Sequence, residues 1–192
     1  MTEGDALSDA ALASRAVDGD TQAFTAIVAR YKAPLYRFIR RYVRDDADAY
    51  DLMQQTYVSA WLSLSRYDAR RSLRTWLQTI ALNKCRDHAR KIKVRRLLFG
   101  TGLVGQATNV ADQSPSVEDE LIRDERERAL ATAIAELPRQ LKEPLLLTVF
   151  GELSQAEAGR QLGISVKAIE TRIARARRKL ADALERLSPE VS

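Results

Sequence analysis

One stretch near the end of the chain, Leu153 to Leu180, has the pattern of two helices joined by a short turn. Ser154 and Glu157 have the spacing of a capping box, which places a helix start at this point. Gly163 tolerates the left-handed backbone that ends a helix, and Ser165 can cap the helix that follows. The stretch is therefore predicted to be a helix-turn-helix motif.

The second of these helices has two faces of different chemistry. Its apolar residues recur at three- and four-residue steps and predict one buried stripe: Val166, Ile169, Ile173, Ala176 and Leu180. We expect this stripe to pack on the first helix through Ala156 and Leu162. The opposite face carries Lys167, Thr171, Arg172, Arg175 and Arg178. A run of charges alone would suggest a solvated surface, but within a helix-turn-helix motif it favours contact with a DNA major groove.

Composition excludes several classes of function. At 192 residues, 45% of them apolar, the chain can bury one or two cores, and its net charge of +5 favours an anionic partner. Cys85 and His88 are the only residues of their kinds, so neither a disulfide framework nor a metal or cofactor site is expected. No phosphate-binding loop or nucleophile with a base partner is evident, so we do not expect an enzyme. Without a signal peptide or apolar span, a cytoplasmic protein with no membrane insertion is expected.

The N-terminal half has the apolar periodicity of a helical bundle. Helices are expected over Leu7 to Val17, again from Asp20 or Thr21, and from Pro34, where a proline can open a new helix. Asp45 to Asp48 has turn and capping chemistry. Leu52, Thr56, Ala60 and Leu64 then predict a long helix, with Thr56 at the edge of the core.

A second basic segment follows, and then the periodicity stops. The segment contains Lys84, Arg86, Arg90, Lys91, Lys93, Arg95 and Arg96 against the single acid Asp87. Its charge suits nucleic acid, since the chain already contains a helix-turn-helix motif. Beyond it, Gly, Ser, Asn and Pro accumulate as in a linker. We therefore predict an all-α fold of two helical domains, residues 1–97 and 121–192, joined by a flexible linker over 98–120.

Both halves together resemble the extracytoplasmic-function sigma factors of the bacterial sigma-70 family. The match covers about Ser14 to Lys93 and Arg128 to Leu184. The segment DAYDLMQQTYVSAW is similar to the family's polymerase-binding helix, and SLRTWLQTIALNKCRDHAR to its promoter-melting segment, whose usual pattern appears here as Trp76-Leu77, Ile80-Ala81 and Asn83. The stretch from Glu136 to Leu180 resembles the family's minus-35-binding domain.

This resemblance implies an alternative sigma factor, a non-catalytic subunit that binds core RNA polymerase and promoter DNA to start transcription. The implied minus-35 contacts are Lys167, Glu170, Thr171, Arg172, Arg175 and Arg178. The implied minus-10 contacts are Arg74, Asn83, Arg86 and Arg90, beside the loop SRYDARRS. The implied polymerase contacts are Asp48, Asp51, Leu52, Gln54 and Gln55. The resemblance implies no cofactor.

The polymerase-binding segment departs from the family pattern at two positions. Tyr50 and Gln55 stand where the family usually has acids. Some branches that lack these acids are activated by threonine phosphorylation, and Thr56 is the candidate site here. The upstream partner is then either a Ser/Thr kinase or an anti-sigma factor.

Two other classes of function remain open at this stage. One is a two-domain helix-turn-helix regulator that binds an operator without polymerase. The other is an adaptor whose basic segments bind acidic proteins or RNA. The regulator leaves the basic segment at Lys84 to Arg96 unexplained, and the adaptor would show salt-dependent binding without promoter preference.

Overall fold

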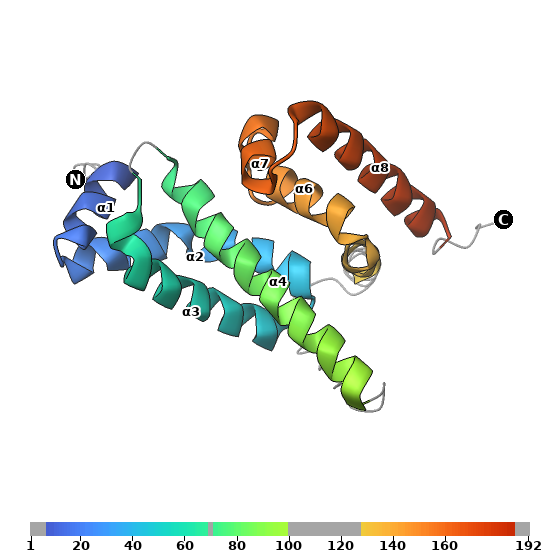
Figure 1. The fold of residues 1–192 in the computed structure, drawn as a ribbon, viewed down its shortest axis with the longest axis horizontal. Helices are drawn as coiled ribbons and strands as arrows, with labels where there is room; N and C mark the ends of the chain where they lie inside the picture. The colour runs from blue at the N-terminus through green and yellow to red at the C-terminus, as the bar shows by residue number, and fades with distance from the viewer. Residues whose placement is uncertain (1–6, 69–70, 100–127, 187–192) are drawn as a thin grey trace, which may run out of the picture.

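The computed structural model describes residues 7–68, 71–99 and 128–186 of the chain, and the regular elements in these ranges are all helical (Figure 1). The helices are α1 (Asp9–Val17), α2 (Thr21–Val43), α3 (Asp46–Ser63), the 3-10 turn η1 (Leu64–Arg66), α4 (Leu73–Phe99), α6 (Arg139–Val149), α7 (Gln155–Leu162) and α8 (Val166–Glu185). Residues 128–136 are helical as well. The predicted all-α class is confirmed.

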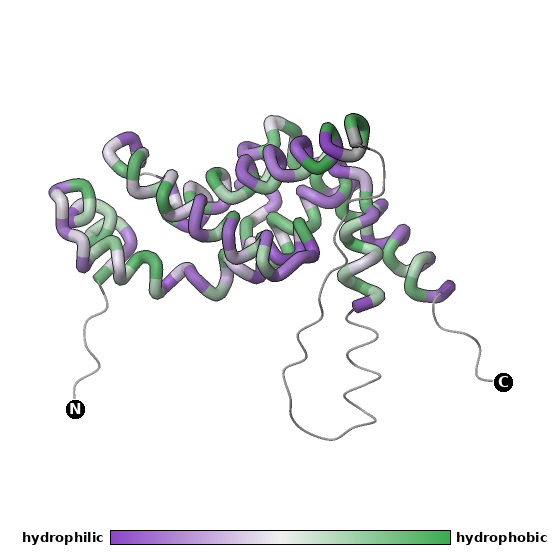
Figure 2. The backbone as a smooth tube through the Cα atoms, turned by 90° about the horizontal axis from the view of Figure 1, so that it is seen from below, coloured by the Kyte–Doolittle hydropathy of each residue, from purple (hydrophilic) through white to green (hydrophobic). Residues whose placement is uncertain are grey.

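The first unit is a bundle in which α2 packs against α1, α3 and α4. Phe38 and Ile39 of α2 are completely buried, as are Ala60 of α3 and Ala81 of α4. Figure 2 shows apolar and hydrophilic residues alternating along these helices, so each helix turns one stripe toward the shared core. Burial of these stripes is what holds the bundle together.

The break expected at Pro34 does not occur. Helix α2 continues through it from Thr21 to Val43. Proline in a helix interior costs about 3 kcal/mol through a lost hydrogen bond and a steric clash. The apolar residues on both sides of Pro34 face the same core, including the buried Ile27 and Phe38, and their burial outweighs that cost.

The second unit consists of residues 128–136 with α6, α7 and α8, and it contains the predicted helix-turn-helix. Ser154 caps α7, and both hydrogen bonds of its capping box with Glu157 are formed. Gly163 ends α7 in the left-handed region at φ 68°. Ser165 caps α8 by accepting a hydrogen bond from the backbone of Ala168. The helix boundaries predicted from these capping residues are therefore confirmed.

The packing between α7 and α8 differs from the prediction in two residues. Ala156 and Val166 are exposed rather than buried, whereas Ala158 and Gly159 are buried. Gly159 permits close approach, because a Cβ there would lie 2.8 Å from the backbone oxygen of Ile164. The absence of a side chain at this position lets the turn fold back tightly on α7.

The predicted linker lies almost entirely outside the described residues. Of residues 98–120, only 98 and 99 are described, and they extend α4 to Phe99. The first predicted domain therefore ends in a helix that runs two residues beyond its expected limit. Residues 121–127 and 187–192 of the second predicted domain also lie outside the described ranges.

Candidate DNA-binding and polymerase-binding surfaces

The exposed face of α8 gathers five of the six predicted minus-35 residues. Lys167, Glu170, Thr171, Arg175 and Arg178 line a shallow hollow of about 370 Å³. The hollow is also lined by Ala174, which the sequence reasoning missed because an alanine has no charge to mark it. Its methyl group leaves a low point between longer polar side chains, and small apolar groups contact thymine methyl groups in DNA grooves.

Two hydrogen bonds order this hollow before any DNA binds. The Lys167 ammonium lies 3.3 Å from the Glu170 carboxylate, and the Thr171 hydroxyl donates to the backbone oxygen of Lys167 at 2.9 Å. Since the Lys167 side chain is 86% exposed, its ion pair is weak and can exchange for a base or phosphate.

Arg172, the sixth predicted residue, lies elsewhere. It is half-buried and lines a cleft between the two units together with Leu162, Arg86 and Glu143. Arg172 therefore lies on the side of α8 that faces the first unit and does not line the hollow.

The predicted minus-10 residues are distributed along α4 and do not form one open site. Asn83 is exposed, and its side-chain oxygen accepts a hydrogen bond from Arg86 at 3.4 Å. Arg90 is exposed and pairs with Asp87 of the same helix. Arg74 and Arg86, in contrast, are held by carboxylates of the second unit.

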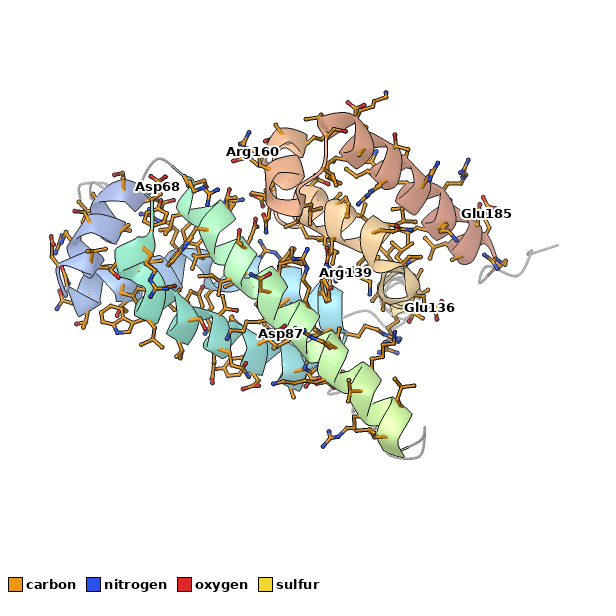
Figure 3. The ribbon with its side chains drawn as sticks, in the orientation of Figure 1. Asp68, Asp87, Glu136, Arg139, Arg160 and Glu185 are labelled. Atoms are coloured by element: carbon orange, nitrogen blue, oxygen red, sulfur yellow. The ribbon has the colours of Figure 1, made fainter. Side chains whose placement is uncertain are left out.

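Arg86 makes the most buried of these contacts. Its guanidinium donates two hydrogen bonds to the Glu143 carboxylate, at 2.8 and 2.7 Å. Arg139 of α6 donates to the same carboxylate at 2.9 Å, and the Tyr42 hydroxyl donates to it at 3.2 Å. Figure 3 shows Arg139 between α6 and the first unit. Glu143 thus joins α2, α4 and α6 through one buried group.

The charges around Glu143 determine its protonation. Burial alone would raise the pKa of this carboxyl, but the hydrogen bonds and charge of Arg86, with the charge of Arg139, lower the pKa below its ordinary value. The same contact raises the pKa of Arg86. Both groups are therefore charged at neutral pH, and the pair is a charge-assisted, two-pronged interaction.

Further contacts close the interface at the start of α4. Arg74 pairs with Glu152, and the Gln78 amide donates to the backbone oxygen of Gly151 at 2.6 Å. A Cβ on Gly151 would lie 2.9 Å from that amide, so glycine allows this approach. Arg41 of α2 lies over the ring of Phe150, 5.1 Å from its centre. The second unit therefore covers part of the predicted minus-10 surface.

Glu143 is the main residue that sequence reasoning missed. It is the only acid in the segment LKEPLLL of α6, where the other residues except Lys142 are apolar. A lone acid in such a run signals a carboxylate that needs a buried cation. The sequence gives no means of choosing Arg86 as that cation, because the two residues are far apart along the chain.

The predicted polymerase-binding residues lie at the start of α3, and they are not equivalent. Gln54 and Asp51 are exposed, and the Gln55 amide donates to the Asp51 carboxylate at 2.6 Å. The Asp48 carboxylate lies 3.2 Å from Nε2 of His88 on α4. Leu52 is 4% exposed and packs in the core, so it supports the helix instead of forming an open contact surface.

The structure argues against phosphorylation at Thr56. This side chain is 0% exposed, in the core and not at its edge, and its hydroxyl donates to the backbone oxygen of Leu52 at 2.7 Å. A kinase would have to unwind α3 to reach the hydroxyl, and a phosphate has no room in the core. Thr56 is therefore a structural residue of the core and not the expected phosphosite.

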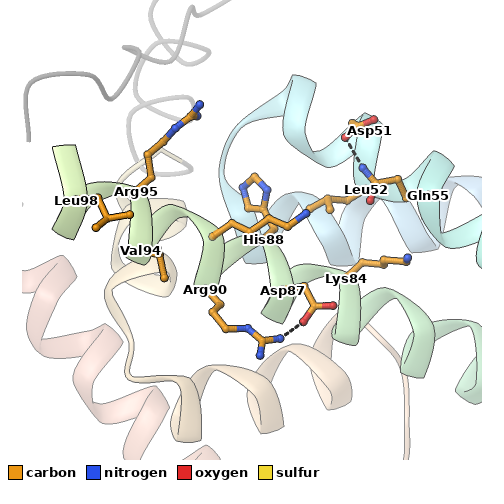
Figure 4. A pocket seen from close by; sticks show the side chains of 11 residues that line it. Asp51, Leu52, Gln55, Lys84, Asp87, His88, Arg90, Val94, Arg95 and Leu98 are labelled. Atoms are coloured by element: carbon orange, nitrogen blue, oxygen red, sulfur yellow. Dashed lines mark hydrogen bonds and ion pairs between the residues drawn. The ribbon is translucent and has the colours of Figure 1, made fainter. Parts of the chain in front are cut away.

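A groove runs between α3 and the C-terminal part of α4 (Figure 4). It has a volume of about 790 Å³ and is lined by Asp51, Leu52 and Gln55 from α3 and by α4 side chains from Lys84 to Leu98. In Figure 1 this end of α4 extends past the start of α3. We call this feature the α3–α4 groove.

The buried cysteine and the possible metal ligands are the remaining candidate groups. Cys85 is buried, and burial raises the pKa of its thiol to about 12, so it stays protonated. Within residues 7–68, 71–99 and 128–186, no cluster of three or more His, Cys, Asp or Glu side chains could hold a metal. None of the helices in the same ranges is both long and apolar enough to cross a membrane.

Comparison with known proteins identifies the family to which this chain belongs. Residues 27–95 match the model of sigma-70 region 2, and residues 127–180 match that of sigma-70 region 4. The chain is 37% identical over 181 residues to the RNA polymerase sigma factor CnrH of Cupriavidus metallidurans, covering 93% of this chain and 95% of that one. The chain belongs to the extracytoplasmic-function branch of the sigma-70 family.

Other members of the family agree in sequence and in fold. The sigma factor SigW of Bacillus subtilis is 33% identical over 174 residues, covering 88% of this chain and 92% of its own. A solved structure of CnrH in complex with the cytosolic domain of CnrY superimposes with a TM-score of 0.69 at 35% identity, covering 96% of this chain and all of that one. The sigma factor RpoE of Bartonella quintana, solved with the anti-sigma factor NepR, shares only the fold, at 21% identity and a TM-score of 0.69.

Membership of this family establishes the general function. The chain is an alternative sigma factor that directs transcription initiation by RNA polymerase. Its partners are core RNA polymerase and promoter DNA, and solved members of the family form complexes with anti-sigma factors. Phosphorylation is not supported.

Proposed function

We propose that this sigma factor divides promoter recognition between two helices and docks on core polymerase through a third. Helix α8 enters the major groove of the minus-35 duplex, and α4 holds the separated minus-10 strand. The exposed side of α3, at Asp51, Gln54 and Gln55, meets the polymerase. We place the end of the first unit near residue 97 and the start of the second near residue 121, and the family matches over residues 27–95 and 127–180 support a division between them.

The observation that carries this proposal is the polar hollow on α8. Its cations and its hydroxyl lie on one rigid, fully exposed helix face whose other side is fixed in the core by Ile169 and Ile173. Such a helix presents a fixed pattern of donors, as reading base edges requires. Thr171 and Lys167 near its start are best placed for bases, while Arg175 and Arg178 are suited to phosphates.

On α4, the exposure of each side chain decides how it can contact the minus-10 strand. Asn83 is open to solvent and can capture an extruded base through its amide. Arg74 and Arg86 must first leave Glu152 and Glu143 before they can contact the strand. Minus-10 binding therefore requires the second unit to move away from α4, and docking on a large polymerase surface can supply that energy.

Run-off transcription with purified core polymerase and a library of genomic promoter fragments tests this function. The expected result is transcription from a defined subset of fragments that share minus-35 and minus-10 elements. Tight operator binding by the free protein, with no affinity for core polymerase, would overturn the proposal in favour of a regulator that acts without polymerase. Binding to all fragments alike, falling steeply with salt, would also contradict it.

A further inference from the structure

The cleft between the two units contains a cation without a partner. Arg172 of α8 is half-buried and lines this cleft, yet it forms no hydrogen bond or ion pair within residues 7–68, 71–99 and 128–186. A guanidinium in this position has lost part of its water without gaining an acceptor, which is unfavourable for a charged group. The side chain of Arg172 therefore favours an anion in the cleft.

Arg139 adds a second cation with unused donors. Its Nε donates to the Glu143 carboxylate at 2.9 Å, but its two terminal nitrogens donate to no group in the described part of the chain, and its side chain is 66% exposed. In Figure 3 this side chain lies between α6 and the first unit. The guanidinium of Arg86, in contrast, is fully engaged, because each of its nitrogens donates to Glu143 or Asn83. Arg139 and Arg172 therefore both have donors available for one anion.

The charges that line the cleft do not balance. Three arginines, Arg86, Arg139 and Arg172, face the single acid Glu143, so three positive charges and one negative charge leave a net charge of +2. The Glu143 side chain is 5% exposed and presents little charge to an incoming anion. A phosphate monoester carries about −1.5 to −2 charge at pH 7 and three acceptor oxygens, whereas a carboxylate carries one charge. A phosphate monoester therefore matches the cleft better.

The remainder of the cleft suits the body of a small organic molecule. Its volume is about 440 Å³. Small-molecule sites in proteins span about 300–1,000 Å³. Pro138, Pro144 and Leu162 line it with apolar surface, and the exposed Gln140 amide offers a donor and an acceptor. Because Arg86 closes the cleft from the first unit, a DNA duplex cannot enter it while the units are in contact.

We propose that the cleft between the two units binds a small phosphate monoester whose organic part is compact and largely apolar. The phosphate oxygens accept hydrogen bonds from the guanidinium groups of Arg172 and Arg139, since the planar fork of arginine matches phosphate geometry. The organic part lies against Pro138 and Leu162. This site is separate from the hollow on α8 and shares none of its lining residues.

The position of the site couples the ligand to the separation of the units. Arg86 belongs to the first unit and the other lining residues belong to the second, so the site is complete only in the closed form. A ligand that binds only this form stabilises it by mass action. Under the proposed function, docking on polymerase separates the units, so core polymerase and the ligand should weaken each other's binding. This coupling rests on the proposed function, whereas binding in the cleft does not.

Isothermal titration calorimetry of the full chain with phenyl phosphate tests the site. Inorganic phosphate, which lacks the apolar part, and benzoate, which replaces the phosphate by a carboxylate, are each expected to bind about tenfold more weakly. Arg172→Gln should weaken binding of phenyl phosphate about tenfold or more, because hydrogen bonds to a charged group are lost. Arg177→Gln is the matched control, since it is the same substitution at an exposed position of α8 outside the cleft, and it should leave affinity unchanged.

A second pair of variants makes the test independent of any effect of Arg172→Gln on folding. Gln140→Glu places an acid in the cleft at an exposed position of α6, and charge repulsion should weaken binding about threefold or more. Gln155→Glu adds the same charge at an exposed position of α7 outside the cleft and should have no effect. Circular dichroism checks that each variant keeps the helical content of the wild-type protein.

The inference is overturned if phenyl phosphate does not bind, or if inorganic phosphate or benzoate binds equally well. It is also overturned if Arg177→Gln weakens binding as much as Arg172→Gln, or if Gln155→Glu weakens it as much as Gln140→Glu.

Core polymerase then separates this inference from the proposed function. Adding core polymerase should weaken binding of phenyl phosphate, and unchanged affinity in the complex would refute the coupling to the closed form. If phenyl phosphate fails to bind while the wild-type protein transcribes normally, the cleft inference falls and the proposed function stands. If phenyl phosphate binds in a way that requires Arg172, but the wild-type protein has no affinity for core polymerase, the proposed function fails and the binding site stands.

Discussion

At the scale of single residues, the contact between the two units depends most on Glu143. This carboxylate is 4% exposed and accepts hydrogen bonds from Arg86, Arg139 and Tyr42, which come from three different helices. A buried carboxylate with two cationic partners is stable only while both remain in place. Domain separation is therefore coupled to the state of this one side chain.

Glu143→Gln is expected to favour the open form. The amide keeps the shape but loses the charge that holds Arg86, and a hydrogen bond to a charged group is worth about 1.5–3 kcal/mol, so the open fraction should rise about tenfold or more. Resonance energy transfer between dyes on Ala10→Cys and Lys179→Cys measures the separation, since the buried Cys85 will not react. Glu136→Gln, at an exposed glutamate, is the control. Equal transfer in wild type and Glu143→Gln would refute the role of Glu143.

Thr56 makes a second prediction at this scale. Thr56→Ala loses one buried hydrogen bond and should cost about 1 kcal/mol of unfolding free energy. Thr56→Glu places a charge in the core and should cost more than about 3 kcal/mol. Urea unfolding measures both, with Gln54→Ala on the exposed side of α3 as a control of near-zero effect. If Thr56→Glu were as stable as wild type and bound core polymerase more tightly, a phosphorylation switch would have to be reinstated.

At the scale of helices, features that depend on neighbours close in sequence were predicted correctly. Features that depend on contacts between distant residues were not. Ser154, Gly163 and Ser165 were assigned correctly because capping depends on neighbours within a few residues. Pro34 was misjudged because its local penalty is offset by core contacts made by the whole of α2. The contact between Arg86 and Glu143 was missed because only the packing of α6 against the first unit creates it.

The candidate sites also divide into residues placed by one helix and residues placed by packing between helices. The polar face of α8 was predicted from helical spacing, since one helix supplies all of its residues, but Ala174 in the hollow on that face was not. Arg172 was assigned to the same face, but it lines the cleft between the units, which only the packing of the second unit on the first creates. Leu52 was assigned to the polymerase contacts and Thr56 to the edge of the core, but the packing of α3 against its neighbours buries both.

Variants on α8 are expected to separate base contacts from phosphate contacts. Thr171→Ala or Lys167→Ala should change the preference among minus-35 sequences, by about 1–3 kcal/mol where a paired base contact is lost. Arg175→Ala should weaken binding to all promoters alike and reduce the slope of log affinity against log salt by about one. The measurement is the affinity of the sigma-polymerase complex for a panel of minus-35 variants at several salt concentrations. Uniform weakening by Thr171→Ala and Lys167→Ala would contradict their assignment to bases.

At the scale of the whole molecule, the two units form one closed arrangement in which α4 is partly covered. Arg74, Gln78 and Arg86 of α4 all contact the second unit. A sigma factor in this form presents α8 to solvent but not the whole of the minus-10 surface proposed on α4. Free protein should therefore bind promoter DNA weakly, and each DNA-binding surface gains from being held on polymerase beside the other.

The closed form should also respond to acid. The pKa of Glu143 lies below its ordinary value of 4.5 in the closed form and returns toward it when the units separate. The contribution of Glu143 to closure is therefore fully present above pH 4.5 and is lost as the pH falls through the lower value. Energy transfer between the two dyes should decrease on acidification below about pH 4.5, and Glu143→Gln should reduce this dependence. Opening on a change from pH 5 to pH 8 would contradict the assignment.

Under the proposed function, this chain opens promoters by holding the minus-10 strand on α4 while α8 holds the minus-35 duplex. Permanganate footprinting tests it directly, because permanganate oxidises unpaired thymines. Core polymerase with the wild-type protein should expose reactive thymines around the minus-10 element. With Asn83→Ala, that reactivity should be lost while protection of the minus-35 element remains. Normal strand opening by Asn83→Ala, or no opening by the wild-type complex at a promoter that it protects, would contradict the proposed role of α4.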